Sequence, residues 1–192
     1  RARLEKLEVV LKEMSLVPIF STYVYEEKFG RSALAKWRAN ELMKFYVDDS
    51  IKAIFDISGG DLANEVLDYL DYDIIRKKNK PFFGYSDLTT VLNAITTKTQ
   101  QATYLYQIMN ILDNVERRAD FKGTLLHNKN NLVDISWHSL QGESIEGIVV
   151  GGNIRCFLKL AGTEYFPDLD NKVLFLEGMS TTIEGLITLL TQ

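Results

Sequence analysis

Two segments of the sequence combine residue types that could carry out covalent or anion-binding chemistry. Ser58-Gly59-Gly60 directly follows a strand-like segment over residues 51–57. Glycine adopts positive φ without steric cost and lets backbone N–H groups approach an anion closely. Ser86 follows the apolar run 81–85 and precedes a helical pattern. A serine at a tight strand-to-helix turn is exposed, and free helix N–H groups can stabilise negative charge, so Ser86 could be a nucleophile.

Both segments also have simpler interpretations. Ser86 could cap the following helix through its hydroxyl. Gly84-Tyr85-Ser86-Asp87 is not the Gly-x-Ser-x-Gly elbow of the α/β-hydrolases, so that family is not indicated. Ser58-Gly59-Gly60 could cradle a phosphate in a small-molecule-binding module, but neither Gly-x-Gly-x-x-Gly nor a P-loop lysine accompanies it.

The composition excludes several other kinds of site. Cys156 is the only cysteine, so an internal disulfide and a zinc site with several thiolates are excluded. His127 and His138 are the only histidines, and they show no metal-ligand spacing with the scattered carboxylates. We therefore expect no metal and no cofactor.

Charge and hydropathy narrow the partners and the compartment. The net charge is −4, and the one basic cluster, residues 76–80, fits a solvated helix end. A nucleic-acid partner is therefore not expected, because phosphate binding needs a concentrated basic face. No stretch approaches the ~20 apolar residues of a membrane span, and no signal peptide is recognisable. We expect no membrane association and a cytoplasmic location.

The elements that must position the two segments alternate between helical and strand-like patterns. Helices are predicted over residues 1–14, 32–45 (capped by Ser32), 61–70 and 86–98, and strands over 51–57, 81–85 and 102–106. This alternation indicates crossover units and a Rossmann-like, mostly parallel sheet with flanking helices.

The second half of the chain has a different pattern. Residues 110–131 are polar and lack clear periodicity, so the domain boundary is placed there. Beyond it we predict strands over 132–137, 145–150 and 173–176, a turn at Gly151-Gly152, a helix over 153–160, and a last helix to Leu190 with a capping box of Thr181 and Glu184. The predicted organisation is an α/β domain over 1–110 that carries Ser86, a linker over 111–131, and a smaller, incomplete mixed α/β C-terminal domain over 132–192.

Longer motifs surround both candidate segments. Pro81-Phe82-Phe83-Gly84-Tyr85-Ser86-Asp87-Leu88-Thr89 follows Ile51-Lys52-Ala53-Ile54, Gly59-Gly60 and Leu70-Asp71-Tyr72-Asp73-Ile74-Ile75. A second block contains Gly151-Gly152-Asn153, Leu160-Ala161-Gly162-Thr163 and Leu174-Phe175-Leu176-Glu177. In order and in sequence, these blocks resemble the LD-carboxypeptidase family of serine peptidases, which includes the microcin C immunity proteins. The resemblance covers most of the chain.

The resemblance implies roles for particular residues. Ser86 corresponds to the nucleophile, and Glu177 to the glutamate that orients the catalytic histidine. The backbone N–H groups of Asp87 and Gly60 would form the oxyanion hole. The residues that we consider as substrate contacts are Gly59, Asn64, Trp137 and Arg155.

The sequence also departs from the family pattern. Neither His127 nor His138 stands in the family's histidine motif, and the first strand and the histidine segment are absent, as in a chain truncated at both ends. Ala63 stands where relatives often have serine. A catalytically defective remnant that folds and binds ligand without turnover is therefore the alternative to an active hydrolase.

The resemblance implies two substrate classes and a homodimer. One class is the amide between an L-diamino acid and D-Ala in murein tetrapeptides, and the other is the amide that joins an aminoacyl group to a nucleotide in microcin C-like toxins. The blocks do not choose between a small peptide and an aminoacyl-nucleotide.

Overall fold

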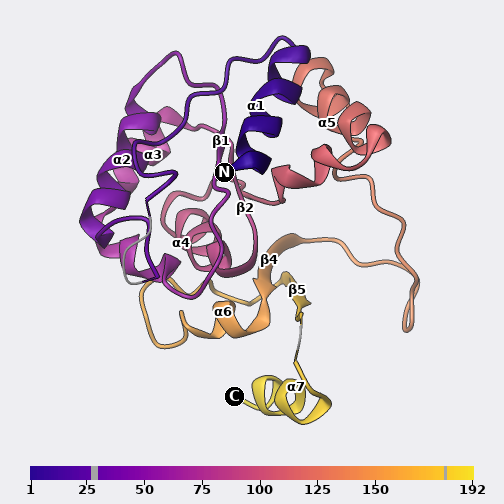
Figure 1. Ribbon diagram of the computed structural model, residues 1–192. Helices are drawn as coiled ribbons and strands as arrows, with labels where there is room; N and C mark the ends of the chain where they lie inside the picture. The colour runs from indigo at the N-terminus through magenta and orange to yellow at the C-terminus, as the bar shows by residue number, and fades with distance from the viewer. Residues whose placement is uncertain (27–29, 180) are drawn as a thin grey trace. The chain divides into compact units, whose positions relative to one another are not determined.

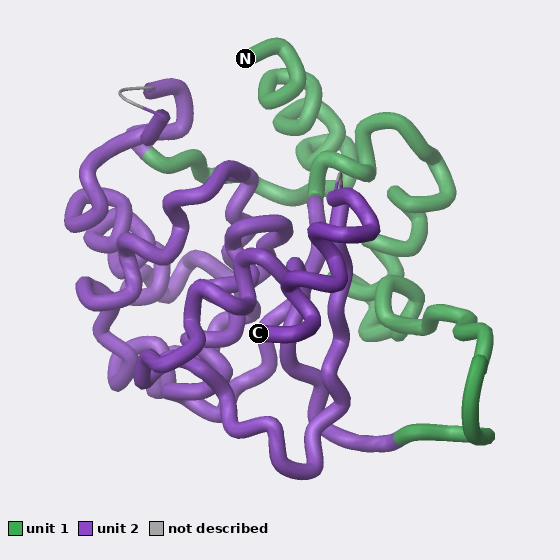
Figure 2. The backbone as a smooth tube through the Cα atoms, turned by 90° about the horizontal axis from the view of Figure 1, so that it is seen from below, with its two compact units in different colours: residues 1–21, 108–145 green, residues 22–107, 146–192 purple. Residues whose placement is uncertain are grey.

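The computed structural model describes residues 1–26, 30–179 and 181–192. It divides into two compact units, which Figure 2 draws in different colours. Unit 1 comprises residues 1–21 and 108–145, and unit 2 comprises residues 22–107 and 146–192. Ser86, the Gly59-Gly60 loop and Glu177 therefore all belong to unit 2.

Unit 2 alternates helices with short strands (Figure 1). Its helices are α2 (Ala35–Val47), the 3₁₀ helices η1 (Ala63–Tyr69) and η2 (Ser86–Leu88), α3 (Tyr72–Lys78), α4 (Thr89–Thr99), α6 (Ile154–Leu158) and α7 (Ile183–Leu190). Its strands are β1 (Ile54–Phe55), β2 (Phe82–Gly84), β3 (Tyr104–Leu105), β4 (Ile148–Asn153) and β5 (Lys172–Glu177). Within the described part of the chain the strands form two parallel sheets, so the predicted α/β class is confirmed.

The first sheet has the strand order β1-β2-β3. Its aromatic side chains stack across the strands, with ring centroids 4.3 Å apart for Phe55 and Phe83 and 4.5 Å apart for Phe83 and Tyr104. The strands are shorter than predicted, but hydrogen bonding continues past their ends, since Asp56 N–H donates to Phe83 O at 2.8 Å and Tyr106 N–H to Gly84 O at 2.7 Å. Because the three strands are parallel, their chain segments leave the sheet at the same edge, where the Gly59-Gly60 loop and the Ser86 turn begin.

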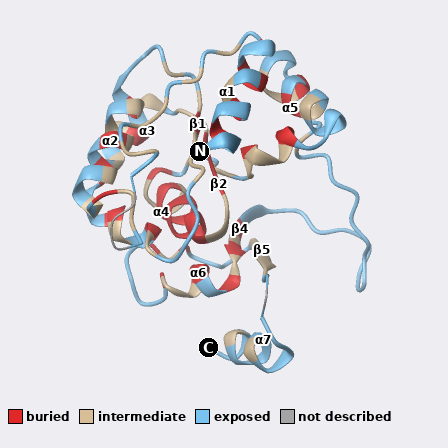
Figure 3. Cartoon of the chain, viewed as in Figure 1, coloured by how far each residue is buried: buried red, intermediate tan, exposed pale blue. Residues whose placement is uncertain are grey.

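Helix α4 lies at the centre of unit 2. It contacts β2, β3, η1, α3, α6 and β4, and Figure 3 shows it as largely buried. Beside its buried apolar residues, it also buries the polar side chains of Thr89, Thr90 and Asn93. Neighbours on several sides leave α4 almost no exposed face, and its buried polar groups form hydrogen bonds.

The second sheet pairs β4 with β5, and the predicted turn at Gly151-Gly152 is wrong, because both glycines lie inside β4. Their φ angles are +115° and +128°. A Cβ on Gly151 would lie 2.1 Å from Phe175 O, and one on Gly152 would lie 2.6 Å from Thr89 Oγ1. The glycines therefore allow the strand to approach its neighbours closely instead of reversing the chain.

Three helix predictions in unit 2 need correction, two in the N-cap and one in the type of helix. Helix α2 begins at Ala35 with Leu34 as its N-cap, so Ser32 does not cap it. The segment predicted as a helix over 61–70 is the 3₁₀ helix η1. The N-cap of α7 is Thr182, whose hydroxyl accepts from Gly185 N–H at 3.1 Å, and not Thr181.

Unit 1 is helical where it is regular. Helix α1 (Ala2–Glu13), predicted from the spacing of Leu4, Leu7, Leu11 and Met14, buries Leu4, Leu7 and Leu11 and, in addition, Val10. The 3₁₀ helix η3 (Ile108–Leu112) and α5 (Val115–His127) follow in the segment that lacked clear periodicity. The strand predicted over 132–137 is wrong, because that segment has turns and no strand. None of the described helices has both the length and the apolar character needed to cross a membrane.

Candidate functional site

Ser86 occupies a tight turn between β2 and α4. Tyr85 is extended, with φ −149° and ψ 170°, and Ser86 then has φ +54°. Positive φ is uncommon outside glycine and is a feature of strained functional turns. A Cβ on Gly84 would lie 2.7 Å from Leu88 Cβ, so the turn closes this tightly only with glycine there.

The structure does not support the capping interpretation of Ser86. The N-caps of η2 and α4 are Tyr85 and Leu88, and neither helix has a side-chain cap hydrogen bond. Ser86 is half-buried in this turn. Its position at the end of a parallel strand, before a helix, is where a nucleophile gains access to substrate.

The Asp87 side chain connects the Ser86 turn to the glycine loop. It is 3% exposed, and its Oδ2 accepts a hydrogen bond from Ala63 N–H at 3.1 Å. The Cβ position of Gly60 lies 4.0 Å from the same oxygen. Burial raises the pKa of Asp87 above its ordinary value and nearby Asp56 adds to this, while the Ala63 N–H and Lys159 act in the opposite direction.

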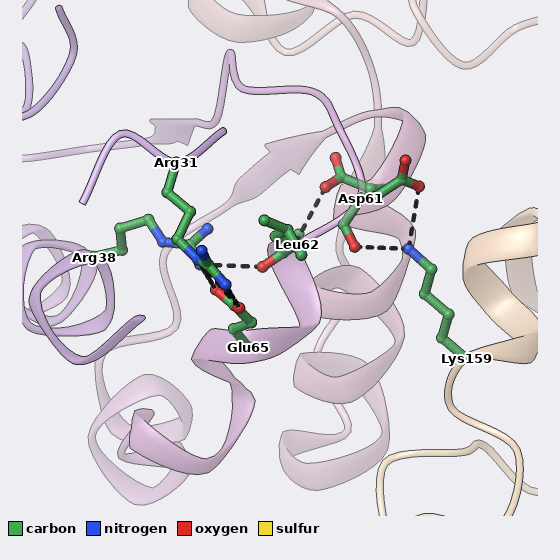
Figure 4. A network of polar contacts seen from close by, with 8 residues as sticks. Arg31, Arg38, Asp61, Leu62, Glu65 and Lys159 are labelled. Atoms are coloured by element: carbon green, nitrogen blue, oxygen red, sulfur yellow. Dashed lines mark hydrogen bonds and ion pairs between the residues drawn. The ribbon is translucent and has the colours of Figure 1, made fainter. Parts of the chain in front are cut away.

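The glycine loop is held at its C-terminal end from opposite sides (Figure 4). Arg38 Nη2 donates to Leu62 O at 3.1 Å and to Glu65 Oε2 at 2.7 Å, and Lys159 Nζ donates to Asp61 O at 2.8 Å. Gly59 and Gly60 themselves are exposed. The loop thus has fixed anchors and an open backbone, which is the arrangement required for N–H groups that bind an anion.

Helix α4 connects the Ser86 turn to the second sheet. The Asn93 side chain donates to Gly151 O at 2.7 Å and accepts from Gly151 N–H at 3.0 Å. Thr89 Oγ1 accepts from Asn153 N–H at 2.9 Å. Asn153 is the register partner of Glu177 across β4 and β5. Its hydrogen bond to Thr89, the first residue of α4, therefore links the strand pair that ends at Glu177 to the helix that follows the Ser86 turn.

A pair of cations, Arg155 in α6 and Lys159 at its C-cap, contacts Asp61 of the glycine loop. Arg155 Nη1 lies 2.6 Å from Asp61 Oδ1, and Lys159 Nζ lies 3.4 Å from the same oxygen. Burial favours the neutral form of Asp61, but the hydrogen bond from Lys159 and the charge of Arg155 outweigh it, so the pKa of Asp61 is lowered. The arrangement carries one more positive than negative charge.

The remaining predicted site residues divide between the two units. Asn64 is exposed at the start of η1 in unit 2. Trp137 is 73% exposed and belongs to unit 1, as do the exposed His127 and His138. Of the predicted residues, the structure brings together Ser86, Asp87, Gly59, Gly60 and, through Asp61, Arg155. Among the described residues, no group of three or more His, Cys, Asp or Glu could hold a metal ion.

Several contributing residues were missed from the sequence. Lys159 stands four residues after Arg155, a spacing that places both on one helix face and could have been recognised. Asn93 and Thr89 had no such signal, because their partners lie 58 and 64 residues away along the chain. Asp61 directly follows the glycine pair, but no pattern in the sequence singles it out.

Family models match the two segments of the chain that contain the residues described above. Residues 1–106 match the LD-carboxypeptidase N-terminal domain, and residues 146–192 match the LD-carboxypeptidase C-terminal domain. The first match contains the glycine loop, Ser86 and Asp87, and the second contains the β4–α6 junction and Glu177.

Individual relatives agree with this match. A protein of Treponema pallidum (strain Nichols) named as a carboxypeptidase is 29% identical over 203 residues, which cover 92% of this chain and 60% of the relative. The microcin C7 self-immunity protein of Escherichia coli is 27% identical over 201 residues, covering 84% of this chain and 58% of the relative. The chain thus spans about three fifths of the length of these curated relatives.

Solved structures have the same fold. A microcin C7 self-immunity protein in complex with aspartyl sulfamoyl adenosine superposes with a TM-score of 0.82 at 23% identity, covering 98% of this chain and 67% of that chain. The muramoyltetrapeptide carboxypeptidase from Oxalobacter formigenes gives a TM-score of 0.82 at 21% identity, covering 99% and 65%. Since the N-terminal family model alone covers more than half of the sequence, this chain belongs to the LD-carboxypeptidase family.

Proposed function

We propose that this chain carries the nucleophile and oxyanion-binding part of a serine amidase that removes the C-terminal D-amino acid from a short peptide. The observation that supports this most directly is the Ser86 turn, with positive φ at the serine and with the Asp87 side chain bonded to the glycine loop. Membership of the LD-carboxypeptidase family supports the reaction class. A murein-type peptide that ends in D-Ala is the substrate that this class implies.

In the proposed mechanism Ser86 Oγ attacks the carbonyl carbon of the scissile amide. The backbone N–H groups of Asp87 and Gly60 stabilise the oxyanion, an interaction that typically contributes about 3–4 kcal/mol to transition-state binding. The acyl-enzyme then forms as the amine leaves, and water hydrolyses it. Glu177 would orient the histidine that serves as general base, as the family resemblance implies.

The general base is the part of the mechanism that the 192 residues do not supply in unit 2. His127 and His138 both belong to unit 1, and both are exposed. A triad without one member retains only about 10³–10⁴-fold catalysis over water. We therefore expect very slow turnover by the 192-residue chain alone.

Rescue by imidazole is the experiment that tests the proposal. The chain is incubated with N-acetyl-L-lysyl-D-alanine, and released D-alanine is measured with and without imidazole as an external base. We expect slow release that imidazole accelerates and that Ser86→Ala abolishes, while Ser139→Ala, a change at an exposed serine of unit 1, leaves it unchanged. Release that is equally fast in Ser86→Ala would overturn the role of Ser86.

An aminoacyl-nucleotide is the second candidate substrate. It is favoured by the similarity to the microcin C7 self-immunity protein, and a protein of that name binds aspartyl sulfamoyl adenosine in its solved structure. Incubation with an aspartyl-nucleotide amide in place of the peptide, with released aspartate measured, compares the two classes, and the faster Ser86-dependent cleavage identifies the preferred one. A cytoplasmic location, expected from the sequence, and a homodimeric assembly, implied by the family resemblance, remain parts of the proposal.

A further inference from the structure

Arg155 of α6 and Lys159 at its C-cap together carry two positive charges, but both contact the same single carboxylate. Arg155 and Lys159 stand one helical turn apart on the same face, and both contact the single carboxylate of Asp61. Asp61 directly follows Gly60 in the glycine loop. One positive charge therefore remains uncompensated within this group of three side chains, next to the proposed oxyanion hole.

The two cations differ in what they hold. Lys159 is 24% exposed in its side chain, and its Nζ donates both to the main-chain oxygen of Asp61 and to its carboxylate. That double contact fixes the loop. Arg155 is 57% exposed and contacts Asp61 through one guanidinium nitrogen. Since a guanidinium has five N–H donors, this ion pair leaves most of them able to bind a second partner.

The location of Arg155 relates it to the proposed chemistry. Helix α6 begins directly after Asn153, the register partner of Glu177, and it contacts η2, which begins at Ser86. A carboxypeptidase acts on the last amide of a peptide, so its substrate carries a free carboxylate one residue from the attacked carbonyl. Arginine binds carboxylates in a planar, two-point arrangement that lysine does not reproduce.

We infer that Arg155 is the specificity residue that binds the terminal carboxylate of the peptide substrate. On binding, the guanidinium donors that Asp61 leaves free bind the carboxylate of the ligand, while Lys159 continues to hold the loop through the Asp61 main-chain oxygen. This inference rests on the proposed function, and it adds the group that distinguishes a peptide acid from a peptide amide.

The inference is tested by binding, which needs no turnover. Isothermal titration calorimetry with the whole 192-residue chain measures the affinity for N-acetyl-L-lysyl-D-alanine and for the corresponding D-alaninamide. We expect the acid to bind more tightly, and Arg155→Ala to weaken acid binding about tenfold or more, as loss of a charge-assisted hydrogen bond implies, while amide binding changes less than about twofold. Arg155→Lys should give an intermediate acid affinity. Arg117→Ala, a change at an exposed arginine of unit 1, should leave both affinities unchanged.

A different pattern overturns the inference. If Arg155→Ala weakens binding of the acid and of the amide equally, or changes neither affinity, Arg155 does not bind the terminal carboxylate. If Lys159→Ala removes the preference for the acid and Arg155→Ala does not, the role belongs to Lys159. If the chain shows no Ser86-dependent, imidazole-assisted release of D-alanine, the proposed function is overturned. If the same chain still binds the acid more tightly than the amide, and this preference depends on Arg155, the present inference stands.

Discussion

At the scale of single residues, Asp87 combines a proposed role of its backbone with an observed contact of its side chain. Its backbone N–H is proposed for the oxyanion hole by family resemblance, while its buried side chain accepts a hydrogen bond from the N–H of Ala63, the first residue of η1 after the glycine loop. Its other oxygen, Oδ1, is buried without a hydrogen-bond partner in the described structure. A buried carboxylate that is only partly satisfied favours its neutral form, which is why burial raises the pKa of Asp87.

This pKa shift predicts how stability depends on pH. Because the folded-state pKa lies above the ordinary value of 3.8, the native state binds more protons than the unfolded state between the two pKa values. The contribution of Asp87 to stability is thus complete below pH 3.8 and is lost as the pH rises through the folded pKa. Asp87→Asn does not titrate, so urea unfolding should show its stability gaining on wild type as the pH rises from 3 to 7.

The control for this prediction is an exposed carboxylate. Glu116→Gln, in the first turn of α5, should show no comparable change with pH relative to wild type. A stability difference between Asp87→Asn and wild type that is constant over the whole pH range would contradict the assignment of a raised pKa.

At the scale of elements, the contact between α4 and β4 determines whether the two family segments form one site. It consists of the hydrogen bonds from Asn93 to Gly151 and from Asn153 to Thr89, together with the close approach that Gly151 and Gly152 permit. Removing one partner of a buried hydrogen bond costs the desolvation of the group left behind. The contact is therefore sensitive to single substitutions.

Replacing Asn93 tests the strength of this contact. Asn93 is 4% exposed, and Asn93→Ala leaves both the N–H and the C=O of Gly151 without their partner. We expect a loss of about 2–4 kcal/mol in the free energy of unfolding, measured by urea denaturation. Asn40→Ala, at an exposed position of α2, should change it by less than about 0.5 kcal/mol. Similar values for the two variants would show that the α4–β4 contact contributes little.

At the scale of the whole molecule, apolar side chains remain exposed at the C-terminal end of unit 2. Helix α7 exposes Ile183, Leu186, Ile187 and Leu190 and buries no residue, and β4 and β5 expose Ile148, Val149 and Leu174. Large exposed apolar surfaces favour association. Together with the homodimer that the family resemblance implies, this predicts that the chain self-associates.

Light scattering during size-exclusion chromatography measures that association. We expect the unchanged chain to have a mass above the 21.9 kDa of one chain. The double variant Ile183→Glu/Ile187→Glu should have a mass closer to 21.9 kDa. Thr188→Glu, at a more polar position of the same helix, is the matched control for added charge. A mass of 21.9 kDa at every concentration for the unchanged chain would rule the association out.

The sequence by itself determined the family and the α/β class, and it identified Ser86 as a candidate residue. These inferences depend on local patterns and on motifs that are contiguous along the chain. The apolar spacing of α1 and of α4 likewise predicted helices that the structure contains. The domain limits at 110 and 132 stay predictions. The Gly151-Gly152 turn was wrong because a glycine pair signals backbone freedom without saying whether the chain reverses or approaches a neighbour.

Only the tertiary structure decided which polar residues support the site. Asn93, Thr89 and Lys159 act through partners that are 58, 64 and 98 residues away, and no local pattern encodes such distances. The side chain of Asp87 resembled any acidic residue after a serine until the fold buried it against Ala63. Motifs name the reacting groups, whereas the groups that hold them in place are chosen by packing, because hydrogen-bond geometry exists only once distant segments meet.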